Sequence, residues 1–329
     1  MEYYGTIGPA CADREILTDM FREGMTGVRM NLSHGNLSEH MDWIRMLRRA
    51  SADSGRQMKF LIDLQGPELR IGKLPQPVEL TDGSEVLLGQ GVIKIPDILY
   101  DYVREGSSIL LDDGKILLQV LENGGSYLNC EVVRGGKLYS AKSIAVPGSG
   151  LYPPVLTKND YENLSMAREC GVTGVMLPFV RSAEDLLALR EALDRSGVPE
   201  VEIFAKLESR QGIVSLPELL PYADYFVIAR GDLGNDMPLW KLPRVQKEAA
   251  AFLKKAGKPF MIVTQMLDSM QERAVPTRAE VCDIFNAVLD GADSIMLTGE
   301  TAAGKYPVQA MGYLVRTGEE ALHFREENT

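Results

Sequence analysis

The chain has 329 residues, of which 45% are hydrophobic and 25% charged, and this is the composition of a globular protein. Its 35 lysine and arginine residues and 46 aspartate and glutamate residues give a net charge of −11, which argues against general binding to nucleic acid or anionic membranes. Its four scattered cysteines form no CxxC pair, so neither a disulfide scaffold nor a structural zinc site is expected. With three histidines, a metal would be held by carboxylates, which favours Mg²⁺ or Mn²⁺.

The N-terminal residues lack the basic-then-apolar pattern of a signal peptide. No apolar run approaches the ~18–20 residues needed to span a membrane. The expected location is therefore the cytoplasm, with no membrane partner.

Seven short apolar runs alternate with amphipathic stretches along the chain. Continuous apolar runs are typical of parallel strands that are covered on both faces. The runs are residues 26–30, 58–64, 172–178, 201–207, 225–229, 259–264 and 294–297. The helical patterns between them include residues 182–195, 243–256 and 278–289, and Ser182 with Asp185, and Pro243, mark two helix starts. This alternation predicts βαβ units.

Residues 71–142 break the alternation, because they contain no long helical pattern. Turn dipeptides occur at Asp82-Gly83, Asp113-Gly114, Asn123-Gly124 and Gly135-Gly136, between strand patterns at residues 85–88, 116–121 and 127–133. The remaining residues, 1–70 and 143–329, have the length of one (β/α)8 barrel of about 250 residues. We therefore predict an α/β fold: a (β/α)8 TIM barrel, with residues 71–142 inserted after the third strand as a small all-β lid domain.

Polar side chains cluster just after the predicted strands. The C-terminal ends of barrel strands meet at one mouth, so these residues are expected to form one site. They are Arg29, Asn31, Ser33, His34, Asp63, Glu68, Lys206, Glu208, Asp232, Thr264, Thr298 and Glu300.

Lys206 and Glu208 point the same way at one strand end, and Asp232 follows the next strand. Two carboxylates with substrate or water oxygens suit Mg²⁺, and a lysine beside them suits phosphoryl transfer. A structural salt bridge at the barrel rim is the alternative, and spacing alone leaves both open. Gly231 and Gly234 beside Asp232 would allow backbone N–H groups to hold an anion, although the segment could also be a simple turn.

Residues 29–35 alternate polar and apolar, so Arg29, Asn31 and Ser33 would share one side of an extended segment. Arg29 there could hold phosphate through two hydrogen bonds. Asn31, Ser33 and Asp63 offer oxygens to a hard cation. Alternatively, Ser33 or Asn36 caps the following helix, and a single histidine such as His34 is more often structural.

Arg70 and Lys142 flank the predicted β domain. Charges beside hinges are usually solvated. In these positions, however, the two side chains would lie where a nucleotide phosphate enters beneath a lid.

These segments together resemble the pyruvate kinase family over nearly the whole chain. Several ordered motifs carry the resemblance. They are Gly5-Thr-Ile-Gly-Pro-Ala10, Arg29-Met-Asn-Leu-Ser-His-Gly35, Asp63-Leu-Gln-Gly-Pro-Glu-Leu-Arg70, Lys206-Leu-Glu208, Ala229-Arg-Gly-Asp-Leu-Gly234, Thr264-Gln-Met-Leu-Asp-Ser-Met270, Pro276-Thr-Arg-Ala-Glu280 and Leu297-Thr-Gly-Glu-Thr301.

The resemblance implies a glycolytic enzyme that transfers a phosphoryl group from phosphoenolpyruvate to ADP, giving pyruvate and ATP. Glu208 and Asp232 would then bind Mg²⁺ or Mn²⁺, Lys206 would steady the phosphoryl group, and Arg29 would hold phosphate. The backbone of Gly231 and Asp232 would bind the substrate carboxylate. Thr264 would lie where the enolate is protonated.

The resemblance also implies a K⁺ site and a nucleotide site. The residues that match the K⁺ site are Asn31, Ser33, Asp63 and the carbonyl of Leu64, with Glu68 as the acid found in K⁺-dependent members. The residues that match nucleotide contacts are Asn31, Ser33, His34, Arg70 and Lys142. Relatives are oligomers, so we expect a homodimer through barrel contacts.

The sequence departs from the family pattern in four places. Leu64 and Gln65 replace a Thr-Lys pair, Ala145 replaces an asparagine, and Thr298 stands where serine is commoner. The chain also stops after the eighth barrel helix, so the C-terminal domain that typically binds effectors is expected to be absent. We accordingly expect no activation by sugar phosphates or AMP.

Two other functions remain open from the sequence. A metal-dependent lyase or aldolase acting on pyruvate-like substrates would share the carboxylates, the metal and the basic residue, but would not need Arg70 or Lys142. A catalytically weak regulatory homologue would be consistent with Ala145 and the absent domain. The presence of Lys206, Glu208, Asp232 and Thr264 argues against it.

Overall fold

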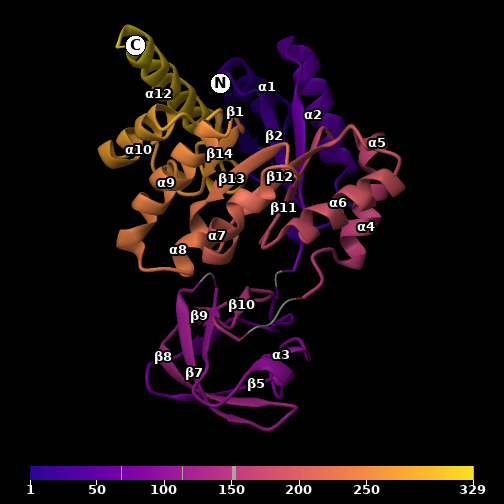
Figure 1. The fold of residues 1–329 in the computed structure, drawn as a ribbon, viewed down its shortest axis with the longest axis vertical. Helices are drawn as coiled ribbons and strands as arrows, with labels where there is room; N and C mark the ends of the chain where they lie inside the picture. The colour runs from indigo at the N-terminus through magenta and orange to yellow at the C-terminus, as the bar shows by residue number, and fades with distance from the viewer. Residues whose placement is uncertain (68, 113, 150–152, 329) are drawn as a thin grey trace. The chain divides into compact units, whose positions relative to one another are not determined.

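The computed structural model describes residues 1–67, 69–112, 114–149 and 153–328 (Figure 1). The chain divides into two compact units. The first combines Met1–Gly66 with Val155–Thr329, and the second is Pro67–Pro154. Each unit is described by itself below.

Within the described residues, the first unit contains eight parallel strands that close into a barrel. They are β1 (Glu2–Thr6), β2 (Gly27–Asn31), β3 (Lys59–Asp63), β11 (Gly174–Leu177), β12 (Glu202–Leu207), β13 (Tyr225–Ala229), β14 (Phe260–Val263) and β15 (Ser294–Leu297). The ring closes where β1 pairs with β15. The predicted TIM barrel is therefore confirmed. The seven predicted strands correspond to β2, β3 and β11–β15; those for β13 and β15 match, and the others differ by one or two residues at an end. Strand β1 was not among the predicted apolar runs.

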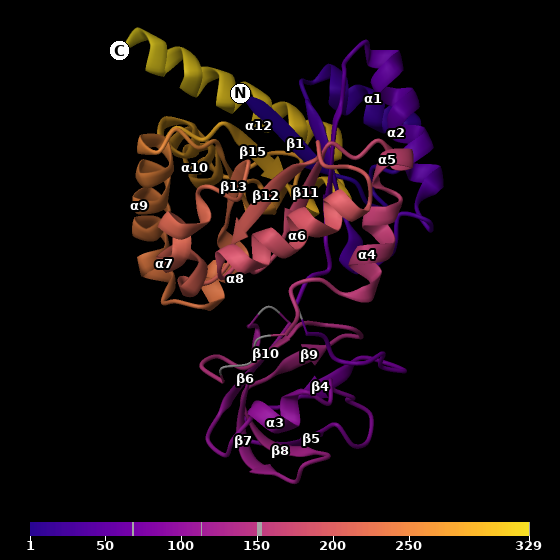
Figure 2. The same ribbon diagram turned by 45° about the vertical axis from the view of Figure 1, so that its right-hand side comes forward.

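Helices surround the barrel strands, as Figures 1 and 2 show. The α-helices are α1 (Arg14–Arg22), α2 (Met41–Ser54), α4 (Lys158–Ser165), α5 (Ala167–Cys170), α6 (Ala183–Arg195), α7 (Arg210–Leu219), α8 (Arg230–Asn235), α9 (Leu242–Lys255), α10 (Arg278–Leu289), α11 (Gly299–Ala302) and α12 (Pro307–Glu327). Short 3-10 turns are η1 (Leu32–His34), η2 (Leu239–Lys241) and η3 (Asp268–Gln271). The three predicted helices correspond to α6, α9 and α10. Ser182 is the N-cap residue of α6, but its side chain makes no capping hydrogen bond.

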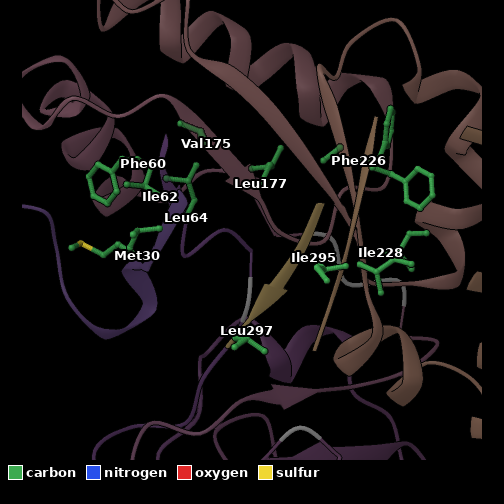
Figure 3. Close-up of a cluster of buried hydrophobic side chains, with 14 of the residues drawn as sticks. Met30, Phe60, Ile62, Leu64, Val175, Leu177, Phe226, Ile228, Ile295 and Leu297 are labelled. Atoms are coloured by element: carbon green, nitrogen blue, oxygen red, sulfur yellow. The ribbon is translucent and has the colours of Figure 1, made fainter. Parts of the chain in front are cut away.

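Two sets of alternating side chains explain why the strands are apolar throughout. Phe60 and Ile62 of β3 belong to the large core between strands and helices, together with Val175 and other labelled residues in Figure 3. Leu61, between them, belongs to a smaller cluster drawn only from barrel strands. Successive strand residues point to opposite faces, so this second cluster fills the barrel interior. Because both faces of such a strand are buried, its sequence is a largely continuous apolar run.

The last helix, α12, packs against α1, α10 and α11, and Figure 2 shows the N-terminus lying beside it. The Tyr3 hydroxyl donates a hydrogen bond of 2.7 Å to Glu319 Oε1 and so ties β1 to this helix. Among the helices of the described residues, none combines the length and the apolar character needed to cross a membrane.

The second unit is inserted after β3 and has its own apolar core. Its elements are β4 (Val78–Leu80), β5 (Glu85–Leu88), α3 (Leu99–Tyr102), β6 (Ser108–Leu111), β7 (Ile116–Asn123), β8 (Leu128–Arg134), β9 (Gly136–Leu138) and β10 (Ile144–Ala145). The strands form a sheet in the order β10-β6-β7-β8-β5 and a separate β4-β9 pair. Gly83 has φ +76° in the turn before β5, which is the backbone conformation that glycine supplies most easily.

The second unit includes more residues on each side than the predicted range 71–142. Hydrogen bonds between the segments that flank this range explain the difference. Ile71 N donates to Lys142 O at 2.9 Å, and Ile144 N donates to Leu69 O at 2.9 Å. Strand β10 then pairs with β6. Residues on both sides of 71–142 thus belong to the same hydrogen-bonded structure. Of the predicted turn residues, Asp113 lies outside the described part of the chain.

Candidate active site

Four charged side chains meet at the C-terminal ends of β2, β3 and β12. The guanidinium of Arg29 donates to Asp63 Oδ2 from Nε at 2.9 Å and from Nη2 at 2.6 Å. Lys206 Nζ lies 3.2 and 3.1 Å from the two Asp63 carboxylate oxygens and 2.9 Å from Glu208 Oε1. The sequence prediction that these strand ends converge therefore holds for this set, which we call the charged cluster (Arg29, Asp63, Lys206 and Glu208).

The charged cluster is buried, so its electrostatics differ from those of a surface salt bridge. The side chains of Asp63 and Glu208 are 3% exposed and that of Lys206 is 12% exposed. Burial alone would raise the pKa of Asp63, but the charges of Lys206 and Arg29 outweigh it and hold that pKa below its usual value. Burial would lower the pKa of Lys206, but Asp63 and Glu208 outweigh it and raise that pKa. Asp63 and Lys206 therefore both carry their charges at neutral pH.

The sequence analysis left open that Lys206 forms a structural salt bridge at the barrel rim. The structure does contain such ion pairs, between Lys206 and the carboxylates of Asp63 and Glu208. Two positive and two negative side chains cancel within the cluster. Replacing one member of such a buried network leaves its partners uncompensated. The arrangement is costly to build for stability alone, and this is common at functional sites.

The segment after β2 is not extended, which corrects one expectation. Arg29 and Asn31 do lie on β2, with Asn31 in register with Asp63 of β3. Ser33, however, lies in the 3-10 turn η1, where its N–H donates to Asn31 Oδ1 at 3.1 Å. The amide of Asn31 tightens the chain into this turn, so Ser33 does not share the strand face of Arg29. His34 ends the same turn.

Neither residue considered as a cap for the next helix serves that purpose. Helix α2 begins at Met41, its N-cap residue is His40, and no side chain caps it. Asn36 instead accepts a hydrogen bond of 3.1 Å from the side-chain amide of Asn163.

Glu208 and Asp232 follow the neighbouring strands β12 and β13, as predicted. Glu208 Oε2 accepts a hydrogen bond of 2.8 Å from Phe179 N, so the backbone after β11 orients the carboxylate. Asp232 lies in the first turn of the short helix α8, which also contains Gly231 and Gly234. The anion-binding role of the Gly231 and Asp232 backbone stays a prediction.

These residues fit a hard divalent cation by donor chemistry. Carboxylate oxygens are its preferred ligands, and Mg²⁺ usually adds oxygens from water or substrate. In the described part of the chain, no group of three or more His, Cys, Asp and Glu side chains is placed to hold a metal. A cation at Glu208 and Asp232 would accordingly need such further oxygens. The oxygens of Asn31, Ser33, Asp63 and Leu64 likewise suit an alkali cation, and the register of Asn31 with Asp63 places two of these residues side by side.

Thr264 directly follows β14 in a strained backbone conformation. Its φ is +78° and that of Gln265 is +54°, and neither residue is glycine. A β-branched residue rarely adopts such a conformation, and each one costs of order 1–3 kcal/mol unless its surroundings enforce it. A Cβ added to Gly231 would lie 3.1 Å from Thr264 Cγ2, so the threonine side chain lies against the start of α8.

Glu300 fastens the loops that follow β14 and β15. It is 1% exposed and accepts hydrogen bonds from Leu267 N at 3.0 Å and from Thr298 N at 2.8 Å. The hydroxyl of Thr298 donates to the same carboxylate at 3.2 Å, a bond that serine could also make.

Arg70 and Lys142 belong to the second unit and are described within it. Arg70 Nη1 donates to Ala141 O at 3.0 Å, and Lys142 Nζ lies 2.7 Å from Asp112 Oδ1. Burial would raise the pKa of Asp112, but its bond to Lys142 outweighs this and lowers the pKa. Ala145 is exposed on β10. Glu68 lies outside the described residues.

Asp160 is a buried acidic residue that the sequence analysis did not identify. It is 0% exposed, and it accepts hydrogen bonds from Gln65 N at 2.9 Å, Gly66 N at 3.2 Å and Thr157 N at 2.7 Å. One carboxylate thereby holds both chain segments through which the first unit leads to the insertion. The capping-box pattern Thr157-x-x-Asp160 signals the start of α4. Nothing local signals the bonds to Gln65 and Gly66, about a hundred residues earlier.

The sequence analysis also did not identify Arg230, although this residue lies inside the motif Ala229–Gly234. Its guanidinium reaches from α8 to the loop after β14, where Nη2 donates to Thr264 O at 2.6 Å. The position beside Asp232 could have drawn attention to it. The direction of its side chain could not be known from spacing.

A parallel barrel with charged residues at the carboxyl ends of its strands defines an α/β-barrel enzyme architecture, and comparison with known proteins narrows the class. The family model described as "Pyruvate kinase, barrel domain" matches residues 2–311. The chain is 38% identical to a pyruvate kinase of Bacillus licheniformis, covering 98% of this chain and 57% of that protein. It is 39% identical to a pyruvate kinase of Mycobacterium intracellulare, covering 98% and 70%, and 35% identical to one of Clostridium acetobutylicum, covering 96% and 69%. The chain belongs to the pyruvate kinase family.

Proposed function

We propose that the protein transfers a phosphoryl group from phosphoenolpyruvate to ADP, giving pyruvate and ATP. The observation that supports this most directly is the charged cluster, in which Lys206 is buried between Asp63 and Glu208 at a strand end. Catalysis of phosphoryl transfer is mostly positioning and charge neutralisation, and an ammonium fixed from two sides is suited to both. The family assignment supports the same reaction.

The charge balance of the cluster explains why cations belong to the proposal. The four side chains already cancel, whereas a substrate with a carboxylate and a phosphate adds about two to three negative charges. Extra positive charge is needed to hold that substrate in a buried place. We propose that Glu208 and Asp232 hold Mg²⁺ or Mn²⁺, and that Asn31, Ser33, Asp63 and the Leu64 carbonyl, with Glu68, hold K⁺. The divalent cation, when bound, would withdraw charge from the phosphoryl and carboxylate oxygens.

The reaction then needs two bond changes at phosphorus and one at carbon. A β-phosphate oxygen of ADP forms a bond to the phosphorus, and the bond from phosphorus to the enol oxygen breaks. Lys206 and Arg29 would stabilise the charge on the phosphoryl oxygens during this step. The enolate left behind takes a proton at its terminal carbon to become the methyl group of pyruvate, and Thr264 would lie where this proton arrives. The Gly231 and Asp232 backbone would hold the carboxylate meanwhile.

Nucleotide binding is assigned to both units. Asn31, Ser33 and His34 after β2, with Arg70 and Lys142 of the second unit, are proposed to contact the phosphates of ADP. Asp112 would then serve as the group that holds Lys142 before the nucleotide binds. The lid role of the insertion, a homodimer through barrel contacts and a cytoplasmic location belong to the same proposal.

The deciding experiment measures pyruvate formation from phosphoenolpyruvate and ADP with Mg²⁺, in K⁺ and in Na⁺. We expect turnover that K⁺ stimulates, and loss of turnover in Lys206→Met. Wild-type turnover no higher than that of Lys206→Met would overturn the proposal. Equal rates in K⁺ and Na⁺ would contradict the proposed K⁺ site but not the proposed reaction. Sedimentation of the purified protein as a monomer would contradict the proposed homodimer.

A further inference from the structure

Arg230 makes an unusually directed set of contacts. Its Nε lies 3.3 Å from Val263 O and 3.2 Å from Thr264 O, and its Nη2 lies 2.6 Å from Thr264 O. The side chain leaves the first residue of α8 and crosses to the end of the neighbouring strand β14. The guanidinium thus donates hydrogen bonds to the consecutive carbonyl groups of Val263 and Thr264, at the start of the strained Thr264–Gln265 backbone.

The opposite edge of the guanidinium is anchored by α10. Arg230 Nη1 forms an ion pair of 2.6 Å with Asp283 Oδ2, and the arginine side chain is 12% exposed. A planar guanidinium presents its donors in a fixed fork. With one edge held by Asp283, the other edge fixes the orientation of the Val263 and Thr264 carbonyl groups.

Arg230 bonds to a segment of backbone that is strained and therefore depends on its surroundings. Thr264 and Gln265 are consecutive non-glycine residues with φ of +78° and +54°. Such conformations persist only where the surrounding structure enforces them. The carbonyl that receives the shortest Arg230 bond is that of Thr264 itself.

We propose that Arg230 is a positioning residue for Thr264, which holds the strained Thr264–Gln265 backbone so that the threonine hydroxyl faces the reacting enolate. The proposal rests on the proposed function, because Thr264 is assigned to the protonation step there. Arg230 itself acts through Thr264 and does not touch substrate. Asp283 fixes the angle at which Arg230 approaches.

The first test compares Arg230→Met and Arg230→Lys. A displacement of about 1 Å at a reacting group can cost about 10²-fold in rate, so Arg230→Met is expected to lower kcat by about that factor with KM for phosphoenolpyruvate nearly unchanged. Arg230→Lys keeps the charge and one donor direction, and is expected to recover part of the loss. An equal loss in both, or a change confined to KM, would contradict the proposal.

Arg190→Met provides a matched control. Arg190 has the same kind of contacts, to Pro199 O at 2.9 Å, to Val201 O at 3.1 Å and to Asp224 Oδ2 at 2.9 Å, but these lie before β12 and β13 at the other end of the strands. Arg190→Met is expected to leave kcat unchanged. An equal loss of kcat in Arg190→Met and Arg230→Met would contradict the proposal, because it would show that removing any arginine bonded to backbone carbonyls in this way slows the enzyme.

The second test is a double-mutant cycle with Thr264→Ala. If Arg230 acts through the Thr264 hydroxyl, Arg230→Met is expected to cause little further loss once that hydroxyl is gone. Exchange of the pyruvate methyl protons with D₂O, followed by NMR, reports on the protonation step directly. Losses that multiply in the double mutant, in turnover and in exchange, would overturn the proposal.

The third test does not depend on activity. Gln265→Gly relieves the cost of the positive φ, because glycine adopts this conformation easily. In the wild type the substitution is expected to stabilise the protein against urea, whereas in Arg230→Met, where the backbone is free to relax, this gain is expected to disappear. Additive unfolding free energies would overturn Arg230 as the residue that holds the strain. A wild-type protein without turnover would instead count against the proposed function, and the urea cycle would still decide the role of Arg230.

Discussion

Strand β3 runs from one end of the barrel to the other, and its two terminal residues show how differently the ends are built. Lys59 at its start forms an ion pair of 2.5 Å with Glu2, with side chains that are 41% and 28% exposed. Asp63 at its end is 3% exposed and pairs with both Arg29 and Lys206. Charges at the N-terminal end remain partly in water, whereas charges at the C-terminal end are withdrawn from it.

Two buried phenols, Tyr4 and Tyr225, lie near the N-terminal end of the barrel. The Tyr4 hydroxyl donates to Glu2 at 2.7 Å, and Tyr225 stacks on Phe204 with ring centroids 4.6 Å apart. Burial raises the pKa of Tyr4 and of Tyr225, so both stay uncharged.

Backbone strain follows the same division. In the described part of the first unit, the non-glycine residues with positive φ are Phe179, Thr264 and Gln265. All three follow the C-terminal ends of strands, after β11 and β14. The comparison teaches that buried charge and backbone strain are concentrated at one end of the barrel, which is where enzymes of this fold carry their active sites.

The largest expected effect distinguishes the two ends by activity. Lys206→Met is expected to lower turnover by about 10³-fold, because it removes a preorganised charge from the transferring group. Lys59→Met is the same substitution at the other end, and its turnover is expected to match the wild type. Steady-state kinetics with phosphoenolpyruvate and ADP measures both, and a comparable loss in Lys59→Met would break the comparison.

The next effect concerns stability. Asp63→Asn leaves Arg29 and Lys206 without their shared carboxylate, and breaking a buried ion pair in this way costs about 3–5 kcal/mol. Urea unfolding monitored by circular dichroism measures the change. The control is Asp53→Asn, which breaks an exposed pair with Arg14 at 2.6 Å, and there the midpoint is expected to shift much less. Equal shifts in the two variants would show that the charged cluster is not energetically distinct from a surface pair.

The phenols near the N-terminal end predict a response to alkaline pH. The pKa of Tyr4 is raised in the folded protein, so its contribution to stability is complete below the unfolded pKa of about 10 and is lost as pH rises toward the folded value. The wild type is therefore expected to lose about 1.4 kcal/mol more per pH unit above pH ~10 than Tyr4→Phe. Urea unfolding between pH 8 and pH 11 tests this, and parallel slopes would refute it.

The smallest effect is that of Tyr4→Phe at neutral pH. The substitution removes one hydrogen bond to Glu2, worth about 1 kcal/mol, and leaves the ring in place. Turnover should stay at the wild-type level, because the change lies away from the charged cluster. A loss of turnover without a loss of stability would mean that the two ends are coupled.

The barrel was predictable because its signal is local. Each buried strand is a continuous apolar run, and β13 and β15 begin and end where the sequence predicts. The charged cluster followed from one general rule, that parallel strands end at one mouth, so that Asp63 and Lys206 meet although they are far apart in the chain. Glu208 required nothing more than its spacing from Lys206.

The remaining features depend on bonds between distant segments. Ser33 leaves the strand face because the Asn31 amide bonds to its backbone, which no alternation pattern records. The direction of Arg230 depends on Asp283, which lies on another helix. The positive φ of Thr264 is enforced by its neighbours and opposes the preference of threonine itself.

The carboxylate of Asp160 bears on how this fold accommodates an inserted unit. It binds the backbone of Gln65 and Gly66 on the outgoing segment and that of Thr157 on the returning one. The two ends of the insertion are thereby held together by the barrel itself. The entropy of closing a loop between such fixed ends grows only slowly with loop length. An insertion anchored in this way can be lengthened, shortened or exchanged over evolution at little thermodynamic cost to the barrel that carries it.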